Sequence, residues 1–192
     1  DNVGNEASVK IAYITVRARF SASHVRSIGS YGAGPGQFDM PVGVSAGPFG
    51  DSIYVSDSRN HRIQKFSTYG KFLLEFGSAG SGQGQFGDSI MAIGPGVDTV
   101  ANTNNILVAD PGNYRIQRFG QFGDFITSFG SRGSGPGQFE TLAWIAADPV
   151  IGQLYAVDSG LNRISVLAAN NGTFLRMFGG PGSGPGQFSD PR

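Results

Sequence analysis

The sequence predicts an all-β protein made of tandem four-stranded units, and a repeated motif carries this prediction. Gly-x-Gly-Gln-Phe occurs four times in the 192 residues, and its glutamines are Gln37, Gln85, Gln138 and Gln187. The steps between them are 48, 53 and 49 residues, a period that indicates a repeat architecture. Four short strands per repeat, with no helical periodicity, are typical of β-propeller blades.

Each repeat contains four short segments rich in β-branched and aromatic residues, which we predict to be strands. In the first unit they cover residues 41–46, 52–56, 62–66 and 72–76. In the second unit they cover residues 89–93, 105–109, 115–119 and 125–129. In the third unit they cover residues 141–146, 153–157, 163–167 and 174–178. A longer loop at 94–104 explains why the second step is the longest.

Partial units flank the three complete ones. We predict one long strand at residues 9–20, which together with 25–28 resembles the third and fourth strands of a preceding blade. The predicted organisation is an N-terminal strand segment and partial blade at 1–33, three blades within 34–188 (about 34–81, 82–134 and 135–183), and the start of another blade at 184–192.

The order of these motifs resembles the NHL repeat. The first unit, from Phe38 to Phe76, contains Pro-x-Gly-Val and then Tyr-Val-x-Asp-x-x-Asn-His-Arg-Ile-Gln-x-Phe. The second unit keeps Asn113-Tyr-Arg-Ile-Gln but lacks the early Pro-x-Gly, and the third has Leu161 where asparagine is expected. The resemblance covers about residues 34–188 and implies a six-bladed propeller, the form in which family members typically close.

Three blades do not close a ring, since propellers have about 4–8 blades. Open ends leave strand edges and blade faces exposed to water. We therefore expect one of three arrangements. The chain is a piece of a longer propeller, two copies pair into a six-bladed ring, or the ends stack into an open assembly in which residues 9–20 join a neighbour's sheet. A closed ring of four blades is disfavoured, because the split blade lacks a second strand.

One face of the propeller is predicted to be the binding surface. Strands alternate in direction, so the glycine-rich linkers and the turns between second and third strands open on the same side, and such loops commonly bind partners. The residues expected there are Arg59, Asn60, His61, Pro111, Asn113, Tyr114, Leu161 and Asn162. The phenylalanines of the linker motif are expected to plug the gaps between blades: Phe38, Phe86, Phe139 and Phe188.

An aspartate ends the second strand of every unit, and an arginine follows five residues later. The pairs are Asp57 and Arg62, Asp110 and Arg115, and Asp158 and Arg163. A ring of carboxylates is one form of metal site, but a catalytic site is normally asymmetric, whereas this pair recurs in every unit. We therefore predict an Asp–Arg hydrogen bond or turn cap that holds each hairpin.

The composition disfavours catalysis. The chain has no cysteine, which removes disulfides, thiol nucleophiles and thiolate metal sites. The resemblance implies comparison with propeller lyases that have a three-histidine zinc site, and the two histidines of this chain, His24 and His61, are too few for such a site. No Gly-x-Ser-x-Gly motif marks a nucleophile. The glycine-rich linkers lie between strands and are not phosphate loops. We predict no catalytic residue, no cofactor and no metal.

The partner is predicted to be a protein, either another copy of this chain or further propeller blades. RNA binding is the main alternative, because the resemblance includes RNA-binding propellers of the TRIM type. A fragment of a metal-dependent lyase or lactonase comes next. Formal net charge is zero, with 14 Lys+Arg against 14 Asp+Glu, which disfavours polyanion binding. A weak basic set would be Arg59, His61, Arg62, Tyr114, Arg115 and Arg118.

Two further features concern location. Asn171-Gly-Thr is an N-glycosylation sequon, but Asn-Gly also suits a tight hairpin turn, which is the role we predict. No apolar run is long enough to cross a membrane, so no membrane partner is expected. The chain begins at Asp1, which is compatible with secretion after signal cleavage, and an extracellular location is favoured over a cytoplasmic one.

Overall fold

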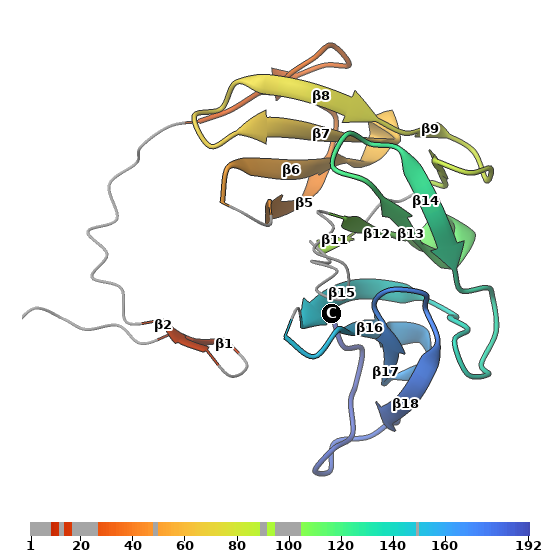
Figure 1. Cartoon of the computed structure of the whole chain (residues 1–192). Helices are drawn as coiled ribbons and strands as arrows, with labels where there is room; N and C mark the ends of the chain where they lie inside the picture. The colour runs from red at the N-terminus through yellow and green to blue at the C-terminus, as the bar shows by residue number, and fades with distance from the viewer. Residues whose placement is uncertain are drawn as a thin grey trace, which may run out of the picture.

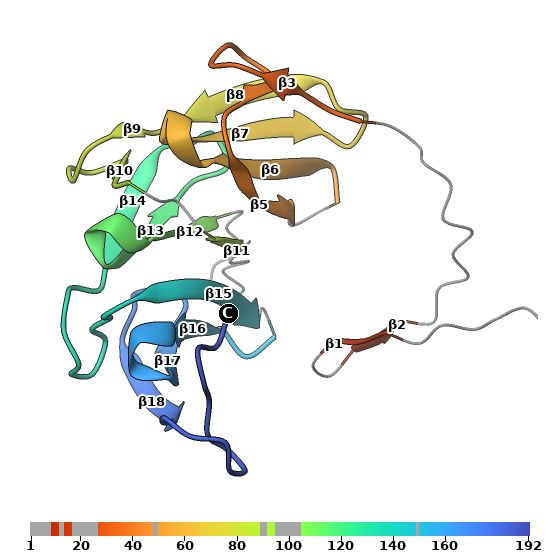
Figure 2. The ribbon, with the colours of Figure 1, turned by 180° about the vertical axis from the view of Figure 1, so that it is seen from behind.

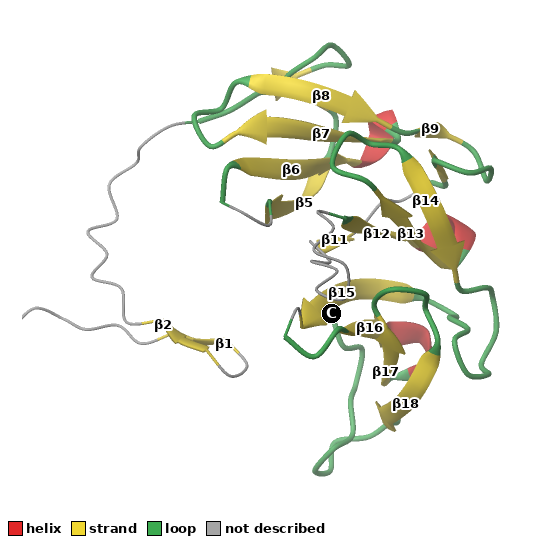
Figure 3. Cartoon of the chain, viewed as in Figure 1, coloured by secondary structure: helices red, strands yellow, loops and turns green. Residues whose placement is uncertain are grey.

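A computed structural model describes residues 9–11, 14–16, 27–47, 50–88, 92–94, 105–148 and 150–192. For 9–11, 14–16 and 92–94 it describes the backbone alone. Of the predicted loop at 94–104, residue 94 belongs to a strand, and residues 95–104 lie outside the described residues, as does His24. Within them, regular structure consists of β-strands and three short 3-10 turns (Figure 3). None of the described helical segments is long and apolar enough to cross a membrane.

Three four-stranded antiparallel sheets follow one another around an arc that does not close (Figure 1). Blade 1 consists of β5 (Pro41–Ala46), β6 (Ser52–Asp57), β7 (Arg62–Ser67) and β8 (Phe72–Phe76). Blade 2 consists of β11 (Ala92–Gly94), β12 (Ile106–Asp110), β13 (Arg115–Phe119) and β14 (Phe125–Phe129). Blade 3 consists of β15 (Leu142–Asp148), β16 (Gln153–Asp158), β17 (Arg163–Ala168) and β18 (Phe174–Gly179). The predicted fold class, an open set of propeller blades, is confirmed.

The second strands reach one residue further than predicted, for a reason visible in their register. Asp57 pairs with Arg62, and Asp110 pairs with Arg115, as the last rungs of their ladders. The aspartate therefore belongs to the strand, and the turn begins after it. The first strand of blade 2 is found at Ala92–Gly94, whereas residues 89–91 of its predicted span lie outside the description.

A β-bulge recurs in the outer strand pair of every blade. The register between β7 and β8 shifts between Lys65 and Phe66, and the same shift occurs at Arg118/Phe119 and Val166/Leu167. A bulge changes the side to which later residues point. In blade 2, Phe125 packs into the core shared with blade 1, whereas Phe129, beyond the bulge, packs into the core shared with blade 3.

The hydrophobic core lies between blades. One cluster joins blades 1 and 2 and includes Tyr54, Ile63, Phe86 and Phe119. A second cluster joins blades 2 and 3 and includes Ile116, Phe139 and Leu167 among others. The linker residues Phe86 and Phe139 are fully buried at these two seams, which are the places where plugs were predicted.

Four glycine-rich segments carry the repeated motif, and we call them linkers 1 to 4: residues 29–40, 77–88, 130–141 and 179–190. In linker 1, β3 (Ser30–Tyr31) pairs in parallel with β4 (Gln37–Phe38). Linker 2 repeats this with β9 (Ser78–Ala79) and β10 (Gln85–Phe86), and single bridges join Arg132 to Phe139 and Pro181 to Phe188. All four linkers therefore fold alike.

The glutamine and glycines of the motif depend on one another. Gln37 Oε1 accepts a hydrogen bond of 2.9 Å from the backbone N–H of Gly34, and the other three linkers repeat this bond at 2.9–3.0 Å. A Cβ at Gly32 would overlap the Gln37 side chain, and the φ of Gly32 is 147°. Only glycine fits this position.

The N-terminal segment differs from its prediction. Where one strand was expected over residues 9–20, the structure has β1 (Val9–Ile11) and β2 (Ile14–Val16), which pair antiparallel with each other. A short hairpin satisfies backbone hydrogen bonds locally, whereas one long strand needs a partner strand. Residues 17–26 lie outside the described part of the chain.

Candidate functional site

The turn between the second and third strands of each blade lies beside the preceding linker. A 3-10 turn occupies each place: η1 (Ser58–Asn60), η2 (Pro111–Asn113) and η3 (Ser159–Leu161). All three lie on the same side of the arc (Figure 2). In blade 1 the backbone N–H of Arg59 donates to the carbonyl of Asp39 at 3.1 Å, so turn and linker are bonded directly.

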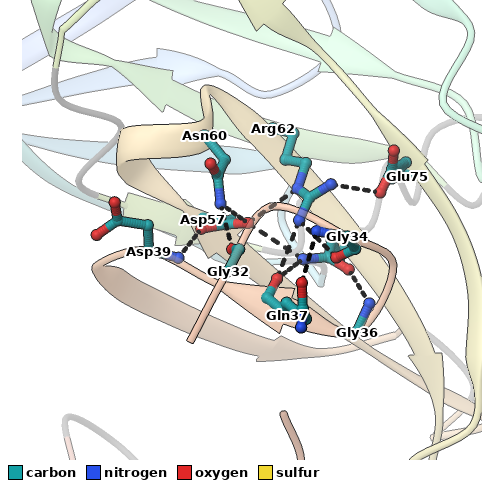
Figure 4. Close-up of polar contacts among 10 residues, drawn as sticks. Gly32, Gly34, Gly36, Gln37, Asp39, Asp57, Asn60, Arg62 and Glu75 are labelled. Carbon is teal, nitrogen blue, oxygen red and sulfur yellow. Dashed lines mark hydrogen bonds and ion pairs between the residues drawn. The ribbon is translucent and has the colours of Figure 1, made fainter. Parts of the chain in front are cut away.

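In blade 1 the buried carboxylate of Asp57 is the centre of a polar network (Figure 4). Its Oδ1 accepts a 2.7 Å hydrogen bond from the backbone N–H of Asp39. Its Oδ2 accepts from Asn60 Nδ2 at 2.9 Å, Arg62 Nε at 2.8 Å and Gln64 Nε2 at 3.1 Å. Hydrogen bonds to the ionised form compensate for the burial of this charge.

The same side chains hold linker 1 by its backbone. Arg62 Nη2 donates to the carbonyls of Gly34 and Gln37, both at 2.9 Å, while Nη1 pairs with Glu75 at 2.8 Å. Gln64 donates to the Gln37 carbonyl at 2.6 Å and accepts from the N–H of Gly36 at 2.8 Å. We call this set, the aspartate with its asparagine, arginine and glutamine, the socket of the blade.

Blade 2 repeats the socket. Asp110 accepts from the backbone N–H of Gly87 at 2.9 Å and from Asn113 at 2.8 Å. Arg115 Nε and Gln117 Nε2 donate to the same carboxylate at 2.9 and 3.1 Å. The Asp–Arg pair thus joins the turn to linker 2 as well as closing its own hairpin.

Blade 3 has a depleted socket. Asp158 accepts from the backbone N–H groups of Glu140 and Thr141 at 3.2 and 2.9 Å. Arg163 Nε lies 3.7 Å from Asp158 Oδ2, too far for a hydrogen bond, although its Nη atoms still donate to linker carbonyls. Arg163 Nε and Ser165 Oγ are buried polar atoms without a hydrogen-bond partner among the described residues. Ser165 and Leu161 stand where blades 1 and 2 have glutamine and asparagine.

Most predicted binding residues on this face are therefore engaged in holding linkers. Besides donating to their aspartates, Asn60 and Asn113 donate to the carbonyls of Gly32 and Gly80 at 3.0 and 2.9 Å. Arg59 is 69% exposed and lies 3.5 Å from Asp39. It is the most accessible cation among the predicted binding residues.

The residue after each 3-10 turn reaches the next linker. His61, Tyr114 and Asn162 all have left-handed backbones, with φ of 50°, 54° and 50°. His61 Nδ1 lies 3.1 Å from the Gly87 carbonyl, and Asn162 Oδ1 accepts from the N–H of Asp190 at 2.7 Å. These residues link consecutive seams.

Tyr114 makes its contact through its ring. The guanidinium of Arg132 lies 5.3 Å from the ring centroid of Tyr114 and also pairs with Glu140 at 3.1 Å. The hydrogen bond that Arg132 donates to Glu140, followed by the charge interaction with Tyr114, raises the pKa of Arg132. Arg132 and Glu140 lie on linker 3, and their side chains are 65% and 42% exposed.

The two ends of the arc expose side chains that are buried at the inner seams. Ile116 of blade 2 is fully buried against blade 3, but the corresponding Ile164 of blade 3 is partly exposed. Phe178 is 44% exposed, whereas its counterparts Phe76 and Phe129 are partly buried against the neighbouring blade. The sequence predicted open ends but not these residues. They can be found in the sequence because each stands at the same distance from the aspartate of its blade as its buried counterpart does.

Two other predicted features can be placed. Asn171 lies in the turn between β17 and β18, where its Oδ1 accepts a 3.0 Å bond from the N–H of Thr173, as expected of a turn residue. Among the described residues no three His, Asp or Glu side chains gather closely enough to hold a metal ion.

Tandem four-stranded blades, joined by linkers that seal the seams between them, define a β-propeller protein. The NHL repeat family model matches residues 38–66, which extend from the linker 1 phenylalanine to Phe66 in β7. The predicted resemblance to the NHL repeat is thereby confirmed for this part of the chain.

Two curated relatives are similar over part of the chain. Over 104 residues, 54% of this chain, it is 36% identical to Protein brain tumor of Drosophila melanogaster. Over 93 residues, 46% of this chain, it is 34% identical to the peptidyl-glycine alpha-amidating monooxygenase of Mus musculus. The matched parts span 10% and 9% of those relatives.

Solved structures show the same fold at low sequence identity. Hydrazine synthase of Kuenenia stuttgartiensis has a TM-score of 0.58 and 16% identity, covering 91% of this chain and 41% of that one. The WD40 repeats of RRP9 have a TM-score of 0.56 and 14% identity, covering 71% and 38%. Both are similar in fold alone.

Proposed function

We propose that this chain is a non-catalytic propeller scaffold for protein–protein interaction and self-association, through its open blade faces and its linker side. The observation that carries the proposal is the exposure of seam residues at both ends. Phe178 is 44% exposed and Val44 is 66% exposed. Ile164 and Val55 are partly exposed, whereas the residues at the same positions in blade 2, Ile116 and Val108, are fully buried. Apolar surface of this kind, on a rigid scaffold, favours association with another protein.

The alternative of RNA binding is less well supported by the geometry. The guanidinium groups of Arg62 and Arg115 are mostly buried and donate to linker carbonyls. Arg118 donates to the carbonyl of Asn170. These three arginines of the predicted basic set therefore already serve inter-segment contacts, which leaves fewer cations for phosphates.

Light scattering of the 192-residue chain over a range of concentrations tests the proposal, followed by electron microscopy of the same samples. We expect particles larger than the 20.1 kDa monomer, with a mass that rises with concentration. A soluble monomer at every concentration would contradict self-association. Tight, strongly salt-dependent binding of a labelled single-stranded RNA by that monomer would favour the nucleic-acid alternative.

A further inference from the structure

The chain has four folded linkers but only three complete blades among its described residues. We propose that linker 4 is a preformed docking segment for the socket of blade 1 in a second copy, where it replaces that copy's own linker 1. Two copies that exchange linkers in this way bring six blades together. This inference rests on the proposed self-association and specifies its geometry.

Linker 4 already has the conformation of linker 1, although among the described residues no socket binds it and blade 3 contacts it through Asn162. Gly182 N–H donates to the Phe188 carbonyl at 3.0 Å, as Gly32 N–H does to that of Phe38 at 3.1 Å. The corresponding residues Met40 and Asp190 both have left-handed backbones, with φ of 60° and 49°, which is uncommon for residues other than glycine. Preorganisation of this kind lowers the entropic cost of binding.

The blade 1 socket recognises backbone groups, so it accepts either linker. Its bonds go to the N–H of Asp39 and Gly36 and to the carbonyls of Gly32, Gly34 and Gln37. Linker 4 carries Gly-Pro-Gly-Gln-Phe at the same spacing as linker 1. Ser189 replaces Asp39, and the N–H that the socket uses is retained.

The exposed aromatic ring of blade 3 matches a turn glycine of blade 1. At the inner seams Phe76 packs on Gly123, where a Cβ would lie 2.7 Å from the Phe76 side chain, and Phe129 packs on Gly172 in the same way. Phe178 is the third residue of this series. Gly70 is the turn glycine of blade 1. Its φ of 81° is similar to the φ of 87° at Gly123 and of 73° at Gly172.

A cation completes the match. Lys65 Nζ donates to the carbonyl of Gln121 at 3.3 Å, and Arg118 donates to that of Asn170. Each acceptor stands two residues before the turn glycine. Blade 3 has Val166 at this position, but its cross-strand neighbour is the exposed Arg176. In the paired copies Arg176 of one copy would donate to the carbonyl of Thr68 in the other, two residues before Gly70.

The exchange explains how the pairing avoids a conflict between linkers. At every inner seam one linker lies between two blades, whereas a seam between two copies brings linker 4 of one copy and linker 1 of the other to a single socket. One of them must leave. Because the second copy buries apolar faces that both monomers expose, replacement of linker 1 by linker 4 is favourable overall.

Equivalent substitutions in the two linkers test the exchange, because they are expected to act in opposite directions on the dimer dissociation constant. Phe38→Ser with Asp39→Pro removes the buried ring and the N–H that linker 1 donates to Asp57. Linker 1 then binds the blade 1 socket more weakly, and linker 4 of the other copy displaces it more easily. We expect the dimer to tighten about tenfold. Phe188→Ser with Ser189→Pro removes the same groups from linker 4 and is expected to weaken the dimer about tenfold.

Milder substitutions guard against misfolding. Gln37→Ala and Gln187→Ala each remove only the internal linker bond, and circular dichroism checks that every variant is folded.

Leu175→Asp, at the exposed bulge of β18, serves as a neutral control for Phe178→Asp, which is expected to weaken the dimer about 30-fold or more. A dimer that both linker variants weaken equally would overturn the exchange and leave self-association intact. A wild-type monomer at all concentrations would overturn both.

Discussion

Blades 1 and 3 use the same buried aspartate but surround it differently. Asp57 accepts four hydrogen bonds, three of them from side chains of the turn and strand that follow it. Asp158 accepts two, both from backbone N–H groups of linker 3. The linker is nevertheless held in both blades, since Arg163 still donates to the carbonyl of Gln138 at 2.9 Å, as Arg62 does to that of Gln37.

The comparison separates two tasks of the socket. The arginine Nη groups hold the linker, and they are present in every blade. The asparagine and glutamine donate to the buried carboxylate and add further bonds to the linker, and blade 3 lacks both. A blade therefore forms its seam without the complete socket, but Arg163 Nε and Ser165 Oγ have no hydrogen-bond partner in the described part of the chain.

The largest expected effect comes from removing the aspartate itself. Asp57→Ala leaves a buried guanidinium and two amide donors without their acceptor, and we expect the free energy of unfolding to fall by about 3–5 kcal/mol. Asp158→Ala removes fewer bonds and is expected to cost about 1–3 kcal/mol. Guanidinium chloride denaturation measures both, with the exposed Asp124→Ala as control. Equal losses in blades 1 and 3 would mean that the extra donors contribute nothing.

Transferring the residue of blade 3 into blade 1 is the next test. Gln64→Ser deprives Asp57 of one donor and the N–H of Gly36 of its acceptor, so we expect a loss of about 1–3 kcal/mol in stability. The matched control is Gln83→Ser, which changes an exposed glutamine in linker 2. If both substitutions had the same small effect, the buried glutamine would have no role in the socket.

The reverse transfer is expected to stabilise the protein. Ser165→Gln supplies Asp158 with the donor that blades 1 and 2 have, and we expect a gain of about 0.5–1.5 kcal/mol. Ser165→Ala removes the unpaired hydroxyl without adding a donor and separates the two contributions. A loss of stability with glutamine but not with alanine would show that blade 3 has no space for the longer side chain.

The smallest effect is expected at the surface. Arg59 is 69% exposed and its pairing with Asp39 is screened by water, so Arg59→Ala is expected to change stability by less than about 1 kcal/mol. Repeating the denaturation at high salt checks this, because an exposed pair weakens with ionic strength. A loss as large as that of Gln64→Ser would place Arg59 in the socket rather than outside it.

Much of the fold follows from local sequence patterns, because strands, turns and linkers repeat with one period. The pairing of Asp57 with Arg62 was predictable for the same reason, because Asp57 ends one strand and Arg62 begins the next after a short turn. The part of the socket formed by Gln64 and the linker carbonyls was not predicted. Those groups are 27 or 28 residues apart, and only the folded arrangement of linker and blade brings them together. The glutamine two residues after Arg62 and Arg115 was the available signal.

Residues in strand-like segments were harder to assign where they lack a repeat. Residues 9–20 have the composition of a strand and resemble only part of a blade, so the repeat did not fix the length of the strand, and the hairpin of β1 and β2 was missed. Composition alone does not distinguish one long strand from two short ones that pair with each other.

The order of linker and blade along the chain has a consequence for how such proteins grow. Linkers 1 to 3 are each bound by the socket of the blade that comes next in the sequence, as linker 2 is by Asp110 and Arg115. A gene segment that encodes residues 77–129 therefore specifies a linker together with the blade that binds it. Tandem duplication of that segment would add a blade with its seam already matched, and no compensating mutation elsewhere would be required.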